Sequence, residues 1–301
     1  MTYADIERRL AGKRVVILDG GTGTELERRG VPMNADAWSG AAALGHLDVL
    51  EAVHRDYIGA GAEIVTVNSF ATSPAMLRAA GLGDRFEEIN RASVGAALRA
   101  REASGNPSAL VAGSVSHMVP PTPPNKAELR DGLGALASLL KAEGCDLILL
   151  EMMYHPDRME AAFEAVAAAG LPVWVGFSAR RGDDGGIVSY TSGVDIPFAE
   201  TVGVLSDYNV AAAGVMHTAA DATGEALAIL QDAYDGPLMA YPDSGYFEMP
   251  NWRFENVLSP DELRRFAEGW ISQGARVIGG CCGLSPAHIA ALAPLRDRRV
   301  P

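Results

Sequence analysis

The sequence predicts an α/β fold, a single (β/α)8 TIM barrel, and three observations support this prediction. Eight short runs of β-type residues alternate with longer amphipathic or alanine-rich runs along the 301 residues. Most of the short runs are apolar throughout, as parallel strands covered by helices should be. The length suits a barrel that forms one domain, so we expect one domain over residues 1–301.

Each predicted strand spans five to seven residues, too few for a helix of ordinary length. In order, the strands are VVILD (15–19), IVTVNS (64–69), ALVAGSV (109–115), LILLEM (147–152), VWVGFS (173–178), AAAGVM (211–216), LMAYP (238–242) and RVIGGC (276–281).

Several of the helices that we expect between the strands begin near Ser, Asp or Pro and end at Gly, as capped helices do. The clearest lie at 46–61, 84–102, 126–144, 155–170 and 259–274. An open doubly wound sheet is the alternative, but it calls for a dinucleotide-binding loop after the first strand. The loop found there, DGGTGTELERRG, lacks the third glycine of that motif, so it predicts a tight turn at the floor of a pocket.

Four long loops (31–40, 117–126, 179–193 and 241–260) are each expected to follow a strand. In a barrel this would place all four at the C-terminal mouth, where active sites of this fold are built.

Composition and charge exclude several classes of partner. The formal charge of −13 disfavours nucleic acid and anionic membranes. No run of about 18 apolar residues occurs, and the first residues are charged, so we expect a cytoplasmic protein that acts on small molecules. Three cysteines make a disulfide framework improbable, and the sequence predicts no oligomeric state.

The sharpest local motif is the adjacent pair Cys281 and Cys282, flanked by glycines in GGCCG after the last predicted strand. The glycines allow a sharp turn, so both thiolates can face one ion and supply half of a tetrahedral zinc site. The alternative is a pair of small buried hydrophobic residues, and the local sequence favours neither.

His217 is the candidate for a third ligand, because it ends the sixth strand two strands away on the same mouth. A lone histidine at a strand end is more often a hydrogen-bonded core or rim residue, but the Cys pair raises the odds of metal binding. A His–Cys–Cys set leaves one position of the metal open, which is typical of catalytic zinc.

Other polar groups at strand ends are candidates for substrate binding. Carboxylates there could hold an ammonium group, and backbone amides could hold a carboxylate. Asp19 could instead cap a turn, and Glu151 could pair with a neighbouring base. The candidates are Asp19, Gly20, Gly21, Asn68, Ser114, Ser116 and Glu151.

The remaining histidines and the third cysteine are weaker candidates. His155 reads as the start of a helix, so metal sharing with Glu151 is not expected. His117 lies on a long loop and could touch substrate, but an exposed loop histidine is the simpler interpretation. Cys145 is expected to be buried and inert.

These motifs together resemble a known family. DGGTGTELERRG, VTVNSF, LILLEM, GVMHT and IGGCCG, in this order, are similar to the homocysteine S-methyltransferase family from about Val15 to about Ala291. The resemblance implies a zinc barrel that binds homocysteine as a thiolate and methylates it from a sulfonium, ammonium or cobalamin donor. It also implies that Cys281 and Cys282 bind zinc.

The resemblance further implies roles for the first and fourth strand ends. Asp19 and Glu151 match contacts of the homocysteine amino group, and Gly20 and Gly21 match the loop near its carboxylate. We therefore expect a zinc-dependent S-methyltransferase that converts homocysteine to methionine with a small sulfonium or betaine donor. Four loop aromatics are candidates to hold a cationic donor, namely Tyr190, Tyr246, Phe247 and Trp252.

One position departs from the family pattern, because His217 stands where the family has a third cysteine ligand. Imidazole can bind zinc, but it makes the site one unit less negative than a thiolate would. Two alternatives therefore stay open: the same zinc barrel acting on a different thiol or methylated compound, and a non-catalytic metal- or ligand-binding barrel.

Overall fold

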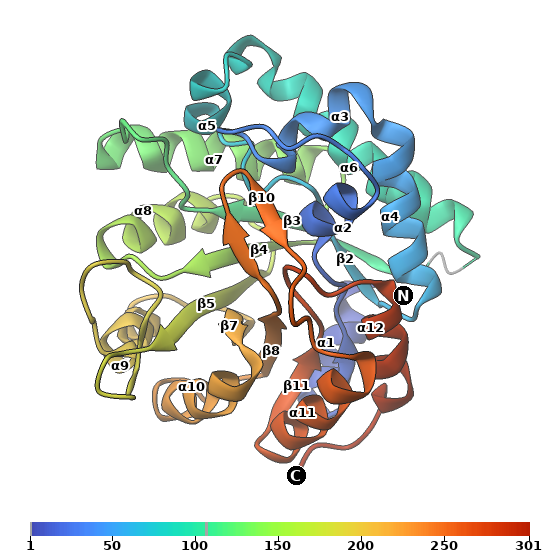
Figure 1. Ribbon diagram of the computed structural model, residues 1–301, viewed down its shortest axis with the longest axis vertical. Helices are drawn as coiled ribbons and strands as arrows, with labels where there is room; N and C mark the ends of the chain where they lie inside the picture. The colour runs from blue at the N-terminus through green and yellow to red at the C-terminus, as the bar shows by residue number, and fades with distance from the viewer. Residues whose placement is uncertain (1, 106–107) are drawn as a thin grey trace.

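A computed structural model describes residues 2–105 and 108–301, and its centre is a ring of eight parallel strands surrounded by helices (Figure 1). The pairing order is β1-β11-β8-β7-β5-β4-β3-β2, and a bridge between Leu18 and Ile64 joins the two ends. The predicted (β/α)8 barrel is therefore confirmed. Its strands are β1 (Val16–Ile17), β2 (Ile64–Thr66), β3 (Leu110–Ser116), β4 (Leu147–Met153), β5 (Val173–Arg181), β7 (Ala212–Ala219), β8 (Leu238–Asp243) and β11 (Ala275–Ile278).

Helices cover the outside of the ring, and side-chain caps fix the starts of several of them. At α7 the Asn125 side chain accepts the N–H of Glu128, and at α11 Ser259 does the same for Glu262. The helices are α1 (Tyr3–Ala11), α2 (Thr22–Arg28), α3 (Ala42–Gly45), α4 (Leu47–Gly59), α5 (Pro74–Ala79), α6 (Phe86–Ala103), α7 (Lys126–Ala142), α8 (Pro156–Ala167), α9 (Phe198–Val202), α10 (Ala220–Ala233), α11 (Pro260–Ser272) and α12 (Pro286–Leu292).

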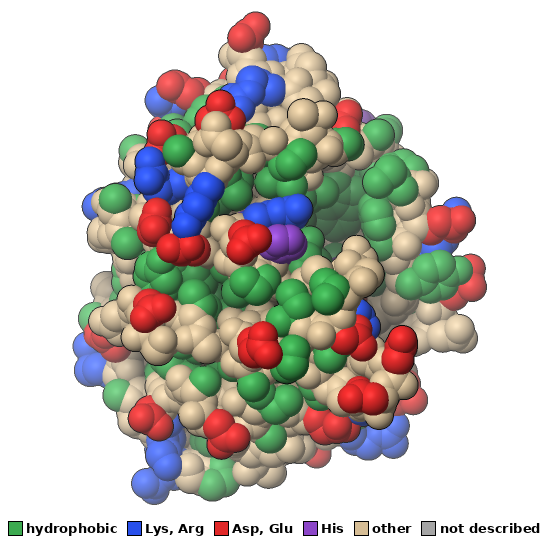
Figure 2. All heavy atoms as spheres, turned by 90° about the vertical axis from the view of Figure 1, so that its left-hand side faces the viewer, with side chains coloured by type: hydrophobic (Ala, Val, Ile, Leu, Met, Phe, Trp, Pro, Cys, Tyr) green, Lys and Arg blue, Asp and Glu red, His purple; other side chains and the backbone are tan. Residues whose placement is uncertain are grey.

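Two hydrophobic layers hold the barrel together. One lies between strands and helices, and the other fills the inside of the ring with side chains such as Leu149, Trp174 and Met239. Sequence analysis did not predict α1. Its residues Ile6 and Leu10 pack against the side chains inside the barrel. Among the described residues, no helix is long and apolar enough to cross a membrane. Acidic and basic side chains are interspersed over the side shown in Figure 2.

Three short strands lie inside stretches that were predicted to be loops. β6 (Ile187–Ser189) pairs with β5, while β9 (Tyr246–Glu248) and β10 (Asn251–Arg253) form a hairpin, drawn in orange in Figure 1. The segment 31–40 follows α2 rather than a strand, so its predicted position in the chain was wrong. It nevertheless contributes Asn34 and Trp38 to the cavity at the barrel mouth.

Candidate metal and substrate site

A cavity of about 260 Å³ lies at the C-terminal ends of the strands and is sized for a small molecule. All but one of the strand-end and metal-ligand candidates line it, although more than 260 positions separate the first from the last. The lining candidates are Asp19, Gly20, Gly21, Asn68, Ser116, Glu151, His217, Cys281 and Cys282. Ser114 is not among them, and its hydroxyl donates to Glu151 instead.

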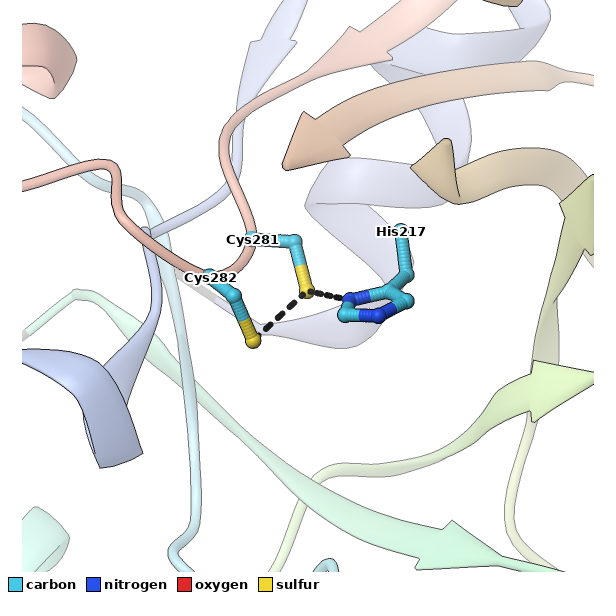
Figure 3. A group of neighbouring side chains, drawn as sticks. All are labelled: His217, Cys281 and Cys282. Atoms are coloured by element: carbon cyan, nitrogen blue, oxygen red, sulfur yellow. Dashed lines mark hydrogen bonds between the residues drawn. The ribbon is translucent and has the colours of Figure 1, made fainter. Parts of the chain in front are cut away.

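His217, Cys281 and Cys282 point their ligand atoms toward one another (Figure 3), and these atoms lie within 4.8 Å of one another. The Cys281 Sγ lies 3.9 Å from the Cys282 Sγ and 3.8 Å from the His217 Nδ1. Tetrahedral zinc, with bonds of about 2.3 Å to sulfur and about 2.0 Å to nitrogen, would place these pairs about 3.8 and 3.5 Å apart. These two pairs therefore already lie at metal-binding distance, and the third pair, Cys282 with His217, lies within 4.8 Å and would draw closer around an ion.

The two adjacent cysteines face one point because their loop is tied at two places to the end of β8. Cys281 donates its N–H to the Pro242 carbonyl, and the Cys282 carbonyl accepts the N–H of Ser244. Gly283 follows with φ +81°, and a Cβ there would lie 1.8 Å from the Ser244 carbonyl oxygen. Only glycine fits that position, which explains the glycine after the pair.

His217 is turned toward the cavity by an unusual backbone conformation. Its φ is +42°, and the pairing register of β7 with β8 shifts between Met216 and Ala219. Met152, next to Glu151 at the end of β4, has φ +53° and lies at a similar register shift. Left-handed conformations cost energy in residues other than glycine, and they concentrate at functional sites.

Asp243, at the end of β8, places a carboxylate beside the imidazole, with its Oδ2 3.4 Å from the His217 Nδ1. Burial alone would lower the pKa of His217, but Asp243, Cys281 and Glu151 together raise this pKa to about 9. The contact with Cys282, together with burial, raises the pKa of Cys281. Both groups thus hold protons in the metal-free protein, and a bound metal would replace those protons.

Asp19 and Glu151 are carboxylates held by neutral hydrogen-bond donors. Asp19 accepts the N–H of Thr66 at 2.6 Å and its hydroxyl at 2.8 Å, and Glu151 accepts the hydroxyl of Ser114. Burial raises the pKa of each carboxyl to about 7. A cation placed between them would restore their ionised forms.

Gly20, Gly21 and Asn68, which were predicted to bind substrate, also make contacts within the protein. Gly21 donates its N–H to the Leu284 carbonyl, and a Cβ on Gly20 would lie 2.4 Å from that same oxygen. The Asn68 amide both accepts from and donates to Ser39, which ties the loop of residues 31–40 to β2. These contacts fix the shape of the cavity floor.

Two of the four loop aromatics flank the metal-binding group. The Tyr190 and Trp252 rings lie 5.1 and 5.7 Å from the His217 ring, measured between centroids. Phe247 also lines the cavity, whereas Tyr246 is half exposed on the β9–β10 hairpin and is not among the cavity-lining residues.

Sequence analysis missed several residues of the cavity and misjudged another. His117 is buried, not exposed, and its Nε2 accepts the N–H groups of Tyr154 and His155. Cys145 is buried, as predicted. The alternation of inward-facing residues along β8 could have pointed to Tyr241 and Asp243.

Comparisons with known proteins agree over nearly the whole chain. Residues 16–295 match the family described as homocysteine S-methyltransferase. The chain is 31% identical to Homocysteine S-methyltransferase of Escherichia coli (92% of this chain, 94% of that protein). It is 30% identical to Betaine--homocysteine S-methyltransferase 1 of Danio rerio (96% and 74%). The metallated crystal structure of the Escherichia coli homocysteine methyltransferase MmuM superposes with a TM-score of 0.73 at 29% identity (95% and 97%).

Proposed function

The chain belongs to the homocysteine S-methyltransferase family, and on that premise we propose that it is a zinc-dependent enzyme that converts homocysteine to methionine. We propose a small sulfonium or betaine-type compound as the methyl donor. The observation that carries the proposal is the meeting of His217, Cys281 and Cys282 at the barrel mouth. A cytoplasmic location and one domain over residues 1–301 are parts of the same proposal.

In this proposal His217, Cys281 and Cys282 hold zinc and leave one coordination position for the acceptor. Zinc bound there would keep the acceptor thiol deprotonated at neutral pH while its sulfur stays nucleophilic. The Asp243 Oδ2 lies 3.4 Å from the His217 Nδ1, the same nitrogen that faces Cys281, so an ionised Asp243 would add negative charge beside the metal where imidazole replaces a thiolate.

Asp19 and Glu151 bind the ammonium group of homocysteine in this proposal, because both carboxyls line the cavity and their hydrogen bonds come from the neutral donors of Thr66 and Ser114. The backbone turn of Gly20 and Gly21 lies beside the substrate carboxylate, and Asn68 keeps the neighbouring loop in place. Tyr190 and Trp252 present aromatic rings to a cationic donor, whose attraction to such rings amounts to roughly 0.5–2 kcal/mol.

The test is methionine formation from homocysteine with S-methylmethionine, S-adenosylmethionine and betaine as donors, followed by mass spectrometry. We expect turnover with at least one donor and none after Cys282→Ala. Cys145→Ala is the matched control, because this cysteine is buried outside the cavity, and it should retain activity. Zinc-loaded protein that methylates homocysteine with none of these donors would contradict the proposal.

A further inference from the structure

Tyr241 of β8 carries a buried hydroxyl without a hydrogen-bond partner among the described residues. The side chain is 1% exposed, yet it lines the cavity at the barrel mouth. A buried polar group without a hydrogen-bond partner destabilises a protein by roughly 1–3 kcal/mol. Such a group therefore points to a partner outside the chain, such as a bound ligand. The proposed function above does not use this hydroxyl.

The fold makes room for this hydroxyl inside the ring. A Cβ on Gly176 of β5 would lie 2.1 Å from the Tyr241 oxygen and 2.9 Å from the Met216 sulfur. The phenol therefore reaches across the barrel interior toward β5, and only a glycine there leaves it space. The glycine at position 176 and the position of the Tyr241 hydroxyl therefore depend on each other.

The groups around the hydroxyl belong to both halves of the proposed site. Burial raises the pKa of Tyr241 well above its usual value, and Glu151, Cys281 and Asp19 raise it further. The phenol therefore keeps its proton and can donate one hydrogen bond while its oxygen accepts another. Glu151 and Asp19 lie on the proposed ammonium side, and Cys281 lies on the sulfur side.

The hydrogen-bonding capacity of an amino-acid substrate matches this arrangement. An ammonium group has three N–H donors, and Asp19 and Glu151 offer it four carboxylate oxygens. Three of these oxygens already accept a protein donor from Thr66 or Ser114. Tyr241 adds an unpartnered oxygen that lines the same cavity and can accept one of the ammonium N–H groups.

We propose that Tyr241 selects the methyl-accepting substrate by forming hydrogen bonds with both of its ends. The Tyr241 oxygen accepts a hydrogen bond from the ammonium group, and the Tyr241 hydroxyl donates a hydrogen bond to the sulfur. A thiol without an amino group at this spacing can make only one of these two hydrogen bonds. This inference rests on the proposed function, because it takes homocysteine as the acceptor.

The test compares two ligands and two proteins by isothermal titration with zinc-loaded protein. The ligands are homocysteine and 4-mercaptobutyrate, which has the same thiol and carboxylate but no amino group. We expect Tyr241→Phe to weaken homocysteine binding about 30-fold and 4-mercaptobutyrate binding about fivefold, since each lost hydrogen bond is worth about 1 kcal/mol. The preference for homocysteine should thus fall about fivefold.

Ser178→Ala is the matched control, because it removes a buried, unpartnered hydroxyl of β5 that is not among the cavity-lining residues. It should leave both dissociation constants unchanged, and thermal unfolding checks that each variant is folded. Equal weakening of both ligands by Tyr241→Phe, or no weakening, would overturn the inference. If the unsubstituted protein does not bind homocysteine, the proposed function itself fails, so the two failures are distinguishable.

Discussion

We expect ionised Asp19 to lower the stability of the ligand-free protein and to bind the ammonium group of the substrate. The Asp19→Asn variant tests both effects. Burial raises the pKa of this carboxyl to about 7, against 3.8 for the ordinary group. Because the folded-state pKa is the higher one, its contribution to stability is complete below about pH 4 and is lost as the pH rises through about 7. Ionised Asp19 thus opposes folding at the pH where it would bind an ammonium group.

The size of the effect follows from the two pKa values. Ionisation of Asp19 lowers the free energy of unfolding by about 2 kcal/mol at pH 5 and by about 4 kcal/mol at pH 8. Asparagine does not ionise, and it can keep both contacts with Thr66, because a hydroxyl can accept as well as donate. The stability of Asp19→Asn relative to the unsubstituted protein should therefore increase by about 2–3 kcal/mol between pH 5 and pH 8.

Urea denaturation of both proteins at pH 5 and pH 8 measures this difference, and effects common to the two proteins cancel. Homocysteine binding to Asp19→Asn should weaken by about 10- to 100-fold at pH 8, since a charge-assisted hydrogen bond contributes roughly 1.5–3 kcal/mol. A stability difference that is the same at the two pH values would refute the reasoning. So would unchanged affinity for homocysteine.

Three further predictions concern the metal and the barrel. Cys281→Ala and Cys282→Ala should each lose zinc and activity together, measured by elemental analysis and methionine formation; zinc retained in full by either variant would remove that residue from the site. His217→Cys should tighten zinc binding in competition with a chelator, because a thiolate adds negative charge at the metal, and weaker binding would count against His217 as a ligand. Gly214→Ala should destabilise the protein by about 1–3 kcal/mol, since its Cβ would lie 2.3 Å from the Met239 side chain of β8. Gly203→Ala is the control, because the space around Gly203 is open. Equal effects of the two substitutions in urea denaturation would contradict this prediction.

The parts of the site that sequence reasoning predicted share one physical cause. Parallel strands end at the same edge of a sheet, so polar residues after apolar runs meet even when they are far apart in the chain. Asp19, Glu151, His217 and the two cysteines line one cavity for that reason. The eight apolar runs could be recognised because both faces of each strand are buried.

The rest depended on contacts that a linear pattern does not contain. His117 lies in a proline-rich stretch that resembles an exposed loop, but it is buried, and backbone N–H groups at the end of β4 satisfy its ring nitrogen. Tyr241 was assigned to a strand, but the space that its hydroxyl occupies depends on a glycine of a different strand, Gly176. The short β9–β10 hairpin was missed because three-residue strands carry too little alternation to be distinguished from a loop.

The most direct test of the central claim is X-ray absorption at the zinc edge on metal-replete protein, together with elemental analysis, before and after homocysteine is added. We expect one zinc per chain with two sulfur ligands and one imidazole nitrogen, and one more sulfur in the shell after homocysteine binds. Protein that retains no zinc, or a shell that gains no sulfur, would contradict the account.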